Sequence, residues 1–121
     1  MDEQQAGHAP LGEHISDRRV TVITSLTVDP GAQDRLVALI LQWTDETVRS
    51  MPGFLSSTVM RSLDGHRVTV ATDWASAEAF ESAARSLAPA PLSQEIAALA
   101  RTDIHLYEFV GGFLGEASLE A

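Results

Sequence analysis

The order in which hydrophobic periods follow one another along the chain is the strongest constraint on its fold. Residues 19–28 alternate in the two-residue period of a half-buried strand and are rich in β-branched side chains. Residues 32–50 repeat apolar side chains every three or four positions, which is typical of an amphipathic helix. The later strand-like runs are residues 54–63, 67–74 and 104–110, with helical segments at 77–87 and 92–101 between the last two.

This order, β-α-β-β-α-β, predicts a ferredoxin-like α+β sandwich in which helices cover one face of an antiparallel sheet. Asp64-Gly65 separates the second and third strand-like runs and suits a tight hairpin, because both residue types tolerate positive φ angles. Ser76 is placed to cap the second helical region, which prolines then interrupt. The segments that we expect are a mobile N-terminal arm, one domain and a C-terminal tail, at residues 1–17, 18–110 and 111–121.

Both faces of the predicted sheet carry apolar side chains. On the last strand-like run, for example, His105 and Tyr107 share the face opposite Leu106. Helices on one side would leave the other apolar face exposed to water. We therefore expect a second copy of the chain to cover that face, giving a homodimer.

The composition excludes several kinds of chemistry. The chain has 121 residues and no Cys, and it also contains no Lys and no Asn, so all eight basic residues are Arg. A Lys Schiff base, a thiolate nucleophile or metal ligand, and an Asn amide that orients a substrate are all excluded. The four His and 17 acidic residues show no metal-binding spacing, and no glycine-rich phosphate loop is present. We expect neither a metal nor a cofactor.

The charge and the first residues limit partners and location. A formal net charge of −9 opposes contact with the phosphate backbone of nucleic acids. No apolar run approaches the roughly 18 residues that cross a bilayer, and the N-terminus is acidic and polar, unlike a signal peptide. We expect a cytoplasmic protein that binds neither nucleic acids nor membranes.

Six short segments occur in a characteristic order between residues 19 and 110. They are VTVI at 20–23 before PG at 30–31, PGF at 52–54, RSLDG at 61–65, DWASAEAF at 73–80 and HLYE at 105–108. Together they resemble the antibiotic biosynthesis monooxygenase (ABM) superfamily. The resemblance implies a dimeric α+β barrel built from two ferredoxin-like subunits.

The resemblance also implies a function. Members similar to the quinone-forming monooxygenases of aromatic polyketide pathways oxidise an anthrone-like substrate with molecular oxygen and without metal, flavin or haem. The substrate supplies the reducing power as an enolate or phenolate. We therefore expect a cofactor-independent monooxygenase acting on an aromatic polyketide-type intermediate in antibiotic biosynthesis. The alternatives are a polyketide cyclase on the same scaffold and a non-catalytic protein that binds an aromatic metabolite.

Other branches of the superfamily fit less well. The haem-degrading branch needs a His in the helix after Trp74, and residues 83–85 there are Ala, Ala and Arg. In the quinone-forming branch, the pocket uses an Asn on the first strand and another on the third. Thr24 and Val70 occupy those positions here, so the resemblance retains only the Trp at the end of the third strand.

The resemblance and the strand faces together give the candidate site. The Trp74 indole would stack on a flat substrate, and the hydroxyls of Thr24 and Thr72 would donate to its oxygens. Each of these residues also has an ordinary structural reason to be where it is, in the core or in a strand. We expect catalytic roles for Trp74, Thr24 and Thr72, and substrate-binding roles for Trp43, Met60, Val70 and Phe80.

Acid–base chemistry for a cyclase would require other residues. His105, Tyr107 and Asp73 are the candidates. We expect His105 and Tyr107 to lie on the sheet face opposite the helices, and that position favours an interface role for both. Arg61 and Arg85 could stabilise a substrate anion or form surface ion pairs.

Overall fold

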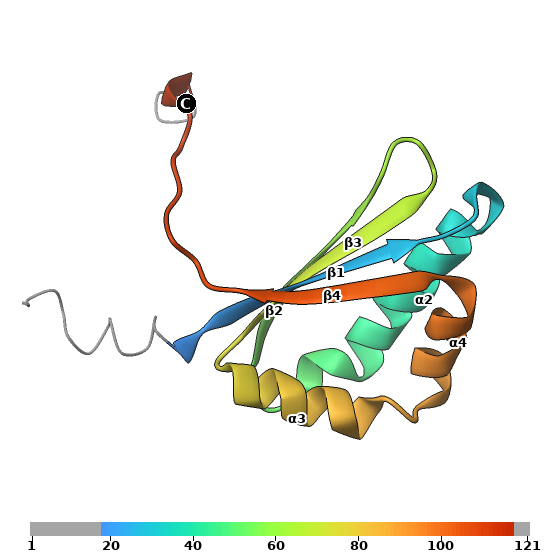
Figure 1. The fold of residues 1–121 in the computed structure, drawn as a ribbon, viewed down its shortest axis with the longest axis horizontal. Coiled ribbons are helices and arrows are strands. Elements are labelled where there is room, and N and C mark those ends of the chain that lie inside the picture. The colour runs from blue at the N-terminus through green and yellow to red at the C-terminus, as the bar shows by residue number, and fades with distance from the viewer. Residues whose placement is uncertain (1–17, 118–121) are drawn as a thin grey trace, which may run out of the picture.

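The computed structural model describes residues 18–117 and contains the elements in the predicted order (Figure 1). The expected mobile arm, residues 1–17, and the end of the tail, residues 118–121, lie outside the described residues. The elements are β1 (Val20–Thr27), the 3-10 turn η1 (Pro30–Ala32), α2 (Gln33–Glu46), the 3-10 turn η2 (Val48–Ser50), β2 (Phe54–Arg61), β3 (Arg67–Trp74), α3 (Ala77–Leu87), α4 (Pro91–Leu99) and β4 (Arg101–Tyr107).

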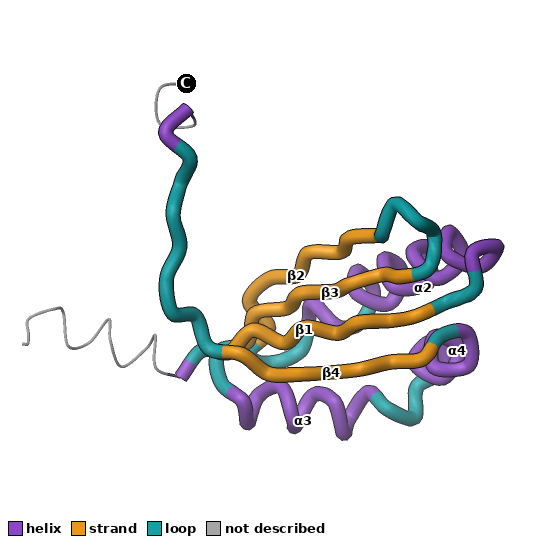
Figure 2. Tube along the Cα trace, turned by 45° about the horizontal axis from the view of Figure 1, so that its top comes forward, coloured by secondary structure: helices purple, strands orange, loops and turns teal. Residues whose placement is uncertain are grey.

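The four strands form one antiparallel sheet in the order β2-β3-β1-β4. Helices α2, α3 and α4 lie against one side of this sheet, which we call the covered face (Figures 1 and 2). The other side, the open face, carries no helix of residues 18–117. The predicted ferredoxin-like α+β fold is therefore confirmed. None of the described helices is both long and apolar enough to cross a membrane.

Two local features fix the junction of α3 with the sheet, and the first, the Ser76 cap, was predicted from the sequence. The Ser76 side chain accepts a hydrogen bond from the Ala79 backbone N–H at 3.0 Å and so caps α3. Gly53, just before β2, has a φ of 87°, and a Cβ there would lie 2.5 Å from the Cβ of Ala79. The turn into β2 therefore needs glycine for its conformation and for the close approach of α3.

The β2–β3 hairpin is closed by a loop rather than by a two-residue turn. Gly65 has a φ of 85°, and the Asp64 carboxylate accepts hydrogen bonds from Ser62 Oγ at 2.7 Å and from the His66 N–H at 3.0 Å. At the base of the loop, the buried Gln33 side chain donates to the backbone oxygens of Ser62 and Arg67, both at 3.0 Å. Helix α2 is thereby fastened to the hairpin.

The last strand differs from its prediction at both ends. It begins at Arg101 rather than at Ile104 and ends at Tyr107 rather than at Val110. The pairing register explains the difference, because Tyr107 lies opposite Thr21, next to the first residue of β1. Beyond Tyr107 only Val20 of β1 remains, so the apolar run that follows leaves the sheet.

The first predicted helix, residues 32–50, is not continuous. Helix α2 ends at Glu46, because Thr47 takes φ −135° and ψ −55°, and the chain resumes as the short turn η2. A β-branched residue favours such a break, since its side chain is restricted within a helix. The break directs Val48 inward while α2 ends beside β2.

Two separate clusters of buried side chains form the core on the covered face. One cluster packs the last residues of β1 and the first residues of β3 against α2. The other packs the first residues of β1 and the last residue of β3 against η2 and α3. The first contains Leu26, Val28, Leu36, Ile40 and Val68, and the second contains Val22, Val48, Trp74 and Ala83.

Candidate functional site

A cavity of about 440 Å³ lies between the covered face of the sheet and the helices. Leu26 and Ile40 of the first core cluster line it, as do Trp74 and Ala83 of the second. The cavity therefore separates the two halves of the core. Its volume is within the range of roughly 300–1,000 Å³ that is typical of small-molecule sites.

The described lining of this cavity contains no ionisable side chain. Most of it is aliphatic or aromatic, which suits an apolar ring system. Among the side chains of this lining, polar atoms are supplied only by hydroxyl and indole groups, namely those of Thr24, Thr44, Thr72, Ser93, Thr102, Trp43 and Trp74.

Three of these hydroxyl residues form a diagonal across the sheet, which we call the hydroxyl diagonal: Thr72, Thr24 and Thr102. Thr72 lies opposite Val22, Thr24 is two residues further along β1, and Thr102 lies opposite Leu26, two residues further again. Diagonal neighbours on one face of a sheet are within reach of each other and of a common ligand. The register of three strands thus gathers three hydroxyls on the floor of the cavity.

Trp74 forms one end of the cavity and is held on three sides. Its Nε1–H donates a hydrogen bond to Thr72 Oγ1 at 2.9 Å. Its ring makes edge-on contacts with Phe54 and Phe80, at centroid distances of 5.4 and 5.8 Å. With 2% of its surface exposed, Trp74 is a fixed wall. Because Thr72 Oγ1 accepts from the indole, its own O–H proton is left to donate to another group.

The structure brings six of the seven expected site residues together. Thr24, Thr72 and Val70 lie on the sheet side of the cavity, with Val70 directly opposite Thr24. Trp43 of α2 and Phe80 of α3 close the cavity from the helix side, and Trp74 of β3 forms its end. The roles expected of these residues remain predictions.

Met60 is the residue that the structure places elsewhere. A bulge between Phe54 and Ser56 shifts the register of β2 by one residue. Phe54 therefore shares the covered face with its partner Trp74, whereas Met60 lies opposite Thr69 on the open face and is half exposed. Strict alternation along β2 would put Phe54 and Met60 on the same face. The bulge between them places Phe54 on the covered face and Met60 on the open face.

The candidate acid–base residues lie on the open face, away from the cavity. Asp73 accepts hydrogen bonds from the side chains of Thr21 and Ser56, and His105 lies 3.2 Å from Asp103. Tyr107 is opposite Thr21 on that same face. The two arginines are not in the cavity either: Arg61 pairs with Asp34 at 2.7 Å, and Arg85 is exposed on α3.

Sequence reasoning missed three hydroxyl groups of the cavity. Thr102 was outside the predicted last strand, because that strand was expected to begin only at Ile104. Thr44 and Ser93 lie on the helices that face the sheet. Their signal in the sequence is weak, since a single hydroxyl residue on an amphipathic helix has no distinctive spacing.

Residues 18–117 contain no group of three or more His, Cys, Asp or Glu side chains arranged to hold a metal ion. A metal centre therefore has no candidate ligand set in this part of the chain.

Solved structures with the same fold include three relevant examples. A monooxygenase from the gene ActVA-Orf6 of Streptomyces coelicolor, in complex with the ligand nanaomycin D, is 26% identical with a TM-score of 0.71 over 82% of this chain and 94% of that one. SnoaB, a cofactor-independent oxygenase from Streptomyces nogalater, is 19% identical with a TM-score of 0.62 over 78% and 96%. A conserved protein from Methanosarcina mazei is 17% identical with a TM-score of 0.63 over 79% and 97%.

Comparison with curated protein sequences found no match. The family model for antibiotic biosynthesis monooxygenase matches residues 19–90, which is more than half of the 121-residue chain. That segment includes β1, β2, β3, α2 and α3, and thus most of the cavity wall. The chain belongs to the antibiotic biosynthesis monooxygenase (ABM) family.

Proposed function

We propose that this chain is a cofactor-independent monooxygenase that oxidises an aromatic polyketide-type intermediate in antibiotic biosynthesis. The observation that carries the proposal is the apolar cavity of about 440 Å³, whose described lining offers hydroxyl and indole groups and no charge. The family membership and the nanaomycin D complex of the Streptomyces coelicolor monooxygenase support the ligand class.

The proposed reaction converts a methylene carbon of an anthrone-like ring into a carbonyl. One oxygen atom of molecular oxygen becomes the new carbonyl oxygen. The other leaves as water together with the two hydrogens of the methylene group, so the substrate supplies all four electrons. Because no ionisable side chain lines the described cavity, the acidity of the substrate itself must provide the reactive enolate.

The chain's contribution is to bind, orient and exclude water. The hydroxyl diagonal faces the site where a ring would lie, and its O–H groups can donate to substrate oxygens that carry the developing negative charge. The Thr72 oxygen already accepts a hydrogen bond from the Trp74 N–H, which leaves its own proton for donation to a substrate oxygen. Three hydroxyls would thus substitute for the two amides of similar enzymes.

A binding protein without activity is the second candidate, and Val70 favours it. This side chain lies opposite Thr24 in the middle of the cavity floor and cannot form a hydrogen bond with a substrate oxygen. A cyclase is less well supported, because its candidate residues His105, Tyr107 and Asp73 are on the open face.

Both tryptophans of the chain line the cavity, so intrinsic fluorescence reports directly on binding there. We expect an anthrone to quench this fluorescence and, in air, to be converted to the quinone with uptake of one O₂ per molecule. Quinone absorbance and an oxygen electrode measure the turnover. Quenching without oxygen uptake above the uncatalysed rate would favour the binding protein, and a lack of quenching would contradict both candidates.

We also propose that the chain is a homodimer in which a second copy covers the open face. The middle of that face has no charged side chain, since Ile23, Ser25, Thr69 and Ala71 occupy it. Charged residues lie toward its ends and its β4 edge, where Arg67, Asp73, Arg101 and Asp103 are found. An uncharged centre with a polar rim is the usual composition of a protein–protein interface.

A further inference from the structure

We infer that the hydroxyl of Ser57, acting through Thr72, carries to the solvent the proton that a bound substrate loses. The inference rests on the oxidation proposed above, because forming an enolate releases one proton into a cavity whose described lining has no ionisable side chain. A charge without a partner is costly in such an apolar space. The proton therefore needs a path of neutral groups that leads out of the cavity.

The Ser57 hydroxyl has no structural partner. Within residues 18–117, its Oγ is the one buried side-chain nitrogen or oxygen atom without a hydrogen bond. Buried polar atoms are nearly always paired, because an unpaired one destabilises the folded chain. A hydroxyl kept in such a position is a candidate for a role other than stability.

The bulge at the start of β2 places this hydroxyl next to the cavity. Without the bulge, alternation from Phe54 would put Ser57 on the open face. With the bulge, Ser57 lies on the covered face, directly opposite Thr72. Bulges are frequent beside active sites, where they redirect a side chain. Ser57 thus adds a hydroxyl at the edge of the sheet, beside the end of the hydroxyl diagonal.

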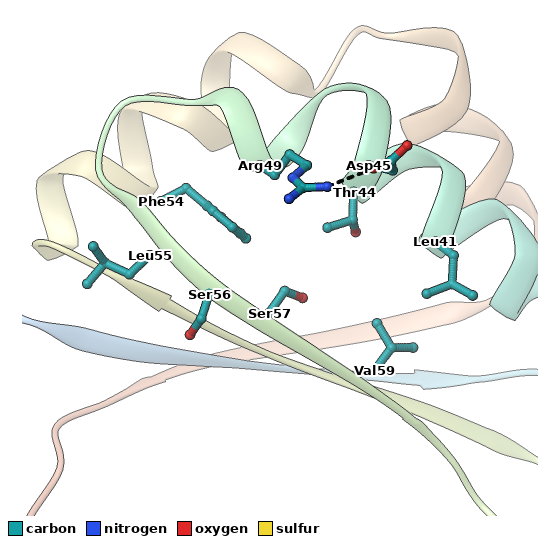
Figure 3. Close-up of a pocket in the computed structure, with 9 residues that line it drawn as sticks. All are labelled: Leu41, Thr44, Asp45, Arg49, Phe54, Leu55, Ser56, Ser57 and Val59. Atoms are coloured by element: carbon teal, nitrogen blue, oxygen red, sulfur yellow. Dashed lines mark hydrogen bonds and ion pairs between the residues drawn. The ribbon is translucent and has the colours of Figure 1, made fainter.

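A groove of about 460 Å³ lies along the outer edge of β2, and we call it the edge groove (Figure 3). Ser57 lines it from the strand, and Thr44 of α2 lines it from the other side. Thr44 also lines the cavity, so the groove and the cavity adjoin at this residue. The rim of the groove carries the exposed ion pair of Arg49 with Asp45, at 2.8 Å. On the side away from Thr72, Ser57 therefore faces a groove that leads to water and to a carboxylate.

The direct route from Thr72 to the mouth of the cavity would be closed by a substrate. The exposed lining residues of the sheet are Thr102 and Ile104, and both belong to β4. Thr72 belongs to β3, and β1 lies between these two strands. A ring that covers Thr24 of β1 would separate Thr72 from the mouth. The edge groove then provides the shorter exit for a proton at Thr72.

One rotation of a side chain brings the two hydroxyls together. Directly opposite residues of an antiparallel pair have Cβ atoms about 4.5–5.5 Å apart. Turning Ser57 about χ1 can therefore bring its Oγ within hydrogen-bond distance of Thr72 Oγ1. No hydrogen bond has to break for this rotation, because the Ser57 hydroxyl has no partner. Thr72 itself is held in place by the Trp74 Nε1–H, which donates to its oxygen at 2.9 Å.

The relay is balanced at each oxygen. The enol O–H of the substrate gives its proton to Thr72 Oγ1, while the proton of Thr72 passes to Ser57 Oγ. The proton of Ser57 passes in turn to water in the edge groove. Each hydroxyl gains one O–H bond as it loses another, so neither becomes charged and the substrate is left as the enolate. Thr72 then donates to the enolate oxygen, and a proton returns by the reverse path when the second oxygen atom leaves as water.

Ser57→Ala removes the relay without changing a residue that lines the cavity. We expect kcat for anthrone oxidation at neutral pH to fall at least tenfold with KM unchanged, as measured by oxygen uptake. Ser57→Thr restores a hydroxyl and should recover most of the rate. Ser56→Ala, on the open face of β2, is the matched control and should leave kcat unchanged.

The pH dependence distinguishes a relay from a structural role. Above the pKa of the substrate, which its absorbance gives in the absence of protein, the substrate binds as the enolate and has no proton to lose. The deficit of Ser57→Ala should therefore disappear as the pH rises through that value. The urea midpoint of Ser57→Ala should equal or exceed that of the unaltered chain, because the hydroxyl that is removed has no partner.

The possible outcomes separate this inference from the function on which it rests. An unaltered chain that does not oxidise anthrone would overturn the proposed function and the relay together. Oxidation at the same rate by the unaltered chain and by Ser57→Ala would overturn the relay alone. A deficit that stays constant across the pKa of the substrate, or that comes with a lower urea midpoint, would give Ser57 a structural role and would also overturn the relay.

Discussion

Consecutive residues of one strand point to two faces of the sheet that differ in chemistry. Along β3, Val70 and Thr72 face the cavity, whereas Ala71 and Asp73 face the open side. The covered face encloses a space lined, within the described residues, only by uncharged side chains. On the open face, ion pairs and hydrogen bonds gather around Asp73 and Asp103.

This difference shows that the proposed ligand site and the proposed dimer contact would use alternate positions of the same strands. In a sheet the side-chain period is two, so a shift of one residue moves a side chain from one function to the other. Met60 is the example, because the bulge in β2 transfers it from the expected cavity to the open face. Substitutions at adjacent residues should therefore have separate effects.

The largest expected effect comes from filling the cavity. Val70→Phe adds a ring at the centre of the cavity floor and should weaken anthrone binding at least 100-fold, as measured by tryptophan quenching. The matched change, Ala71→Phe, adds a ring to the open face and should alter the sedimentation of the dimer while binding is retained. Loss of binding in both variants, or in neither, would contradict the separation of the two faces.

A smaller effect is expected from the aromatic end of the cavity. Trp74→Phe removes the hydrogen bond to Thr72 and part of a buried ring, and should lower the free energy of unfolding by about 2 kcal/mol. Trp43→Phe, at a half-buried position, should cost less. Urea denaturation followed by circular dichroism measures both. Equal losses would show that Trp74 is not the more strongly anchored of the two.

The hydroxyl diagonal should affect the rate more than the fold. Thr24→Val keeps the shape of the side chain and removes one donor from the cavity floor, so we expect kcat for anthrone oxidation to fall about fivefold. Thr58→Val, on the open face of β2, is the isosteric control and should leave kcat unchanged. An unchanged rate in Thr24→Val would remove this hydroxyl from the proposed mechanism.

The fold was largely predictable from the sequence because each element carries its own local signal. The alternation in β1, the Ser76 cap and the Asp64-Gly65 loop all depend on residues close together in the chain. Two predictions were wrong, the bounds of β4 and the face of Met60, and both depend on pairing between strands. β4 ends close to the point where β1 begins, and β2 contains a bulge. Neither event has a signal within the strand concerned.

The candidate site was predictable only where family resemblance added to the strand pattern. Thr72 and Trp74 share a face by alternation along β3, and Thr24 shares the apolar face of β1 with Val22 and Leu26, so each strand indicated by itself which residues face the helices. Thr102 joined them only through the register of β4 against β1. The division of the core into two clusters with a cavity between them depends on how the helices pack, which periodicity does not specify.

The smallest expected effect lies outside both faces, in the hairpin loop. Hydrogen bonds from Ser62 and then from the His66 N–H lower the pKa of Asp64 below its usual value. A lowered pKa means that the folded loop favours the carboxylate, so this support is present above the ordinary pKa and is lost as the pH falls through the lowered one. We expect the His66 amide resonance to shift in that acidic range and to lose this titration in Asp64→Asn. Asp64 is not among the residues that line the cavity, so quenching by a neutral ligand should stay constant as long as the chain remains folded. If the ligand affinity instead changed over the same pH range as the His66 amide resonance, the hairpin loop and the covered face would be coupled.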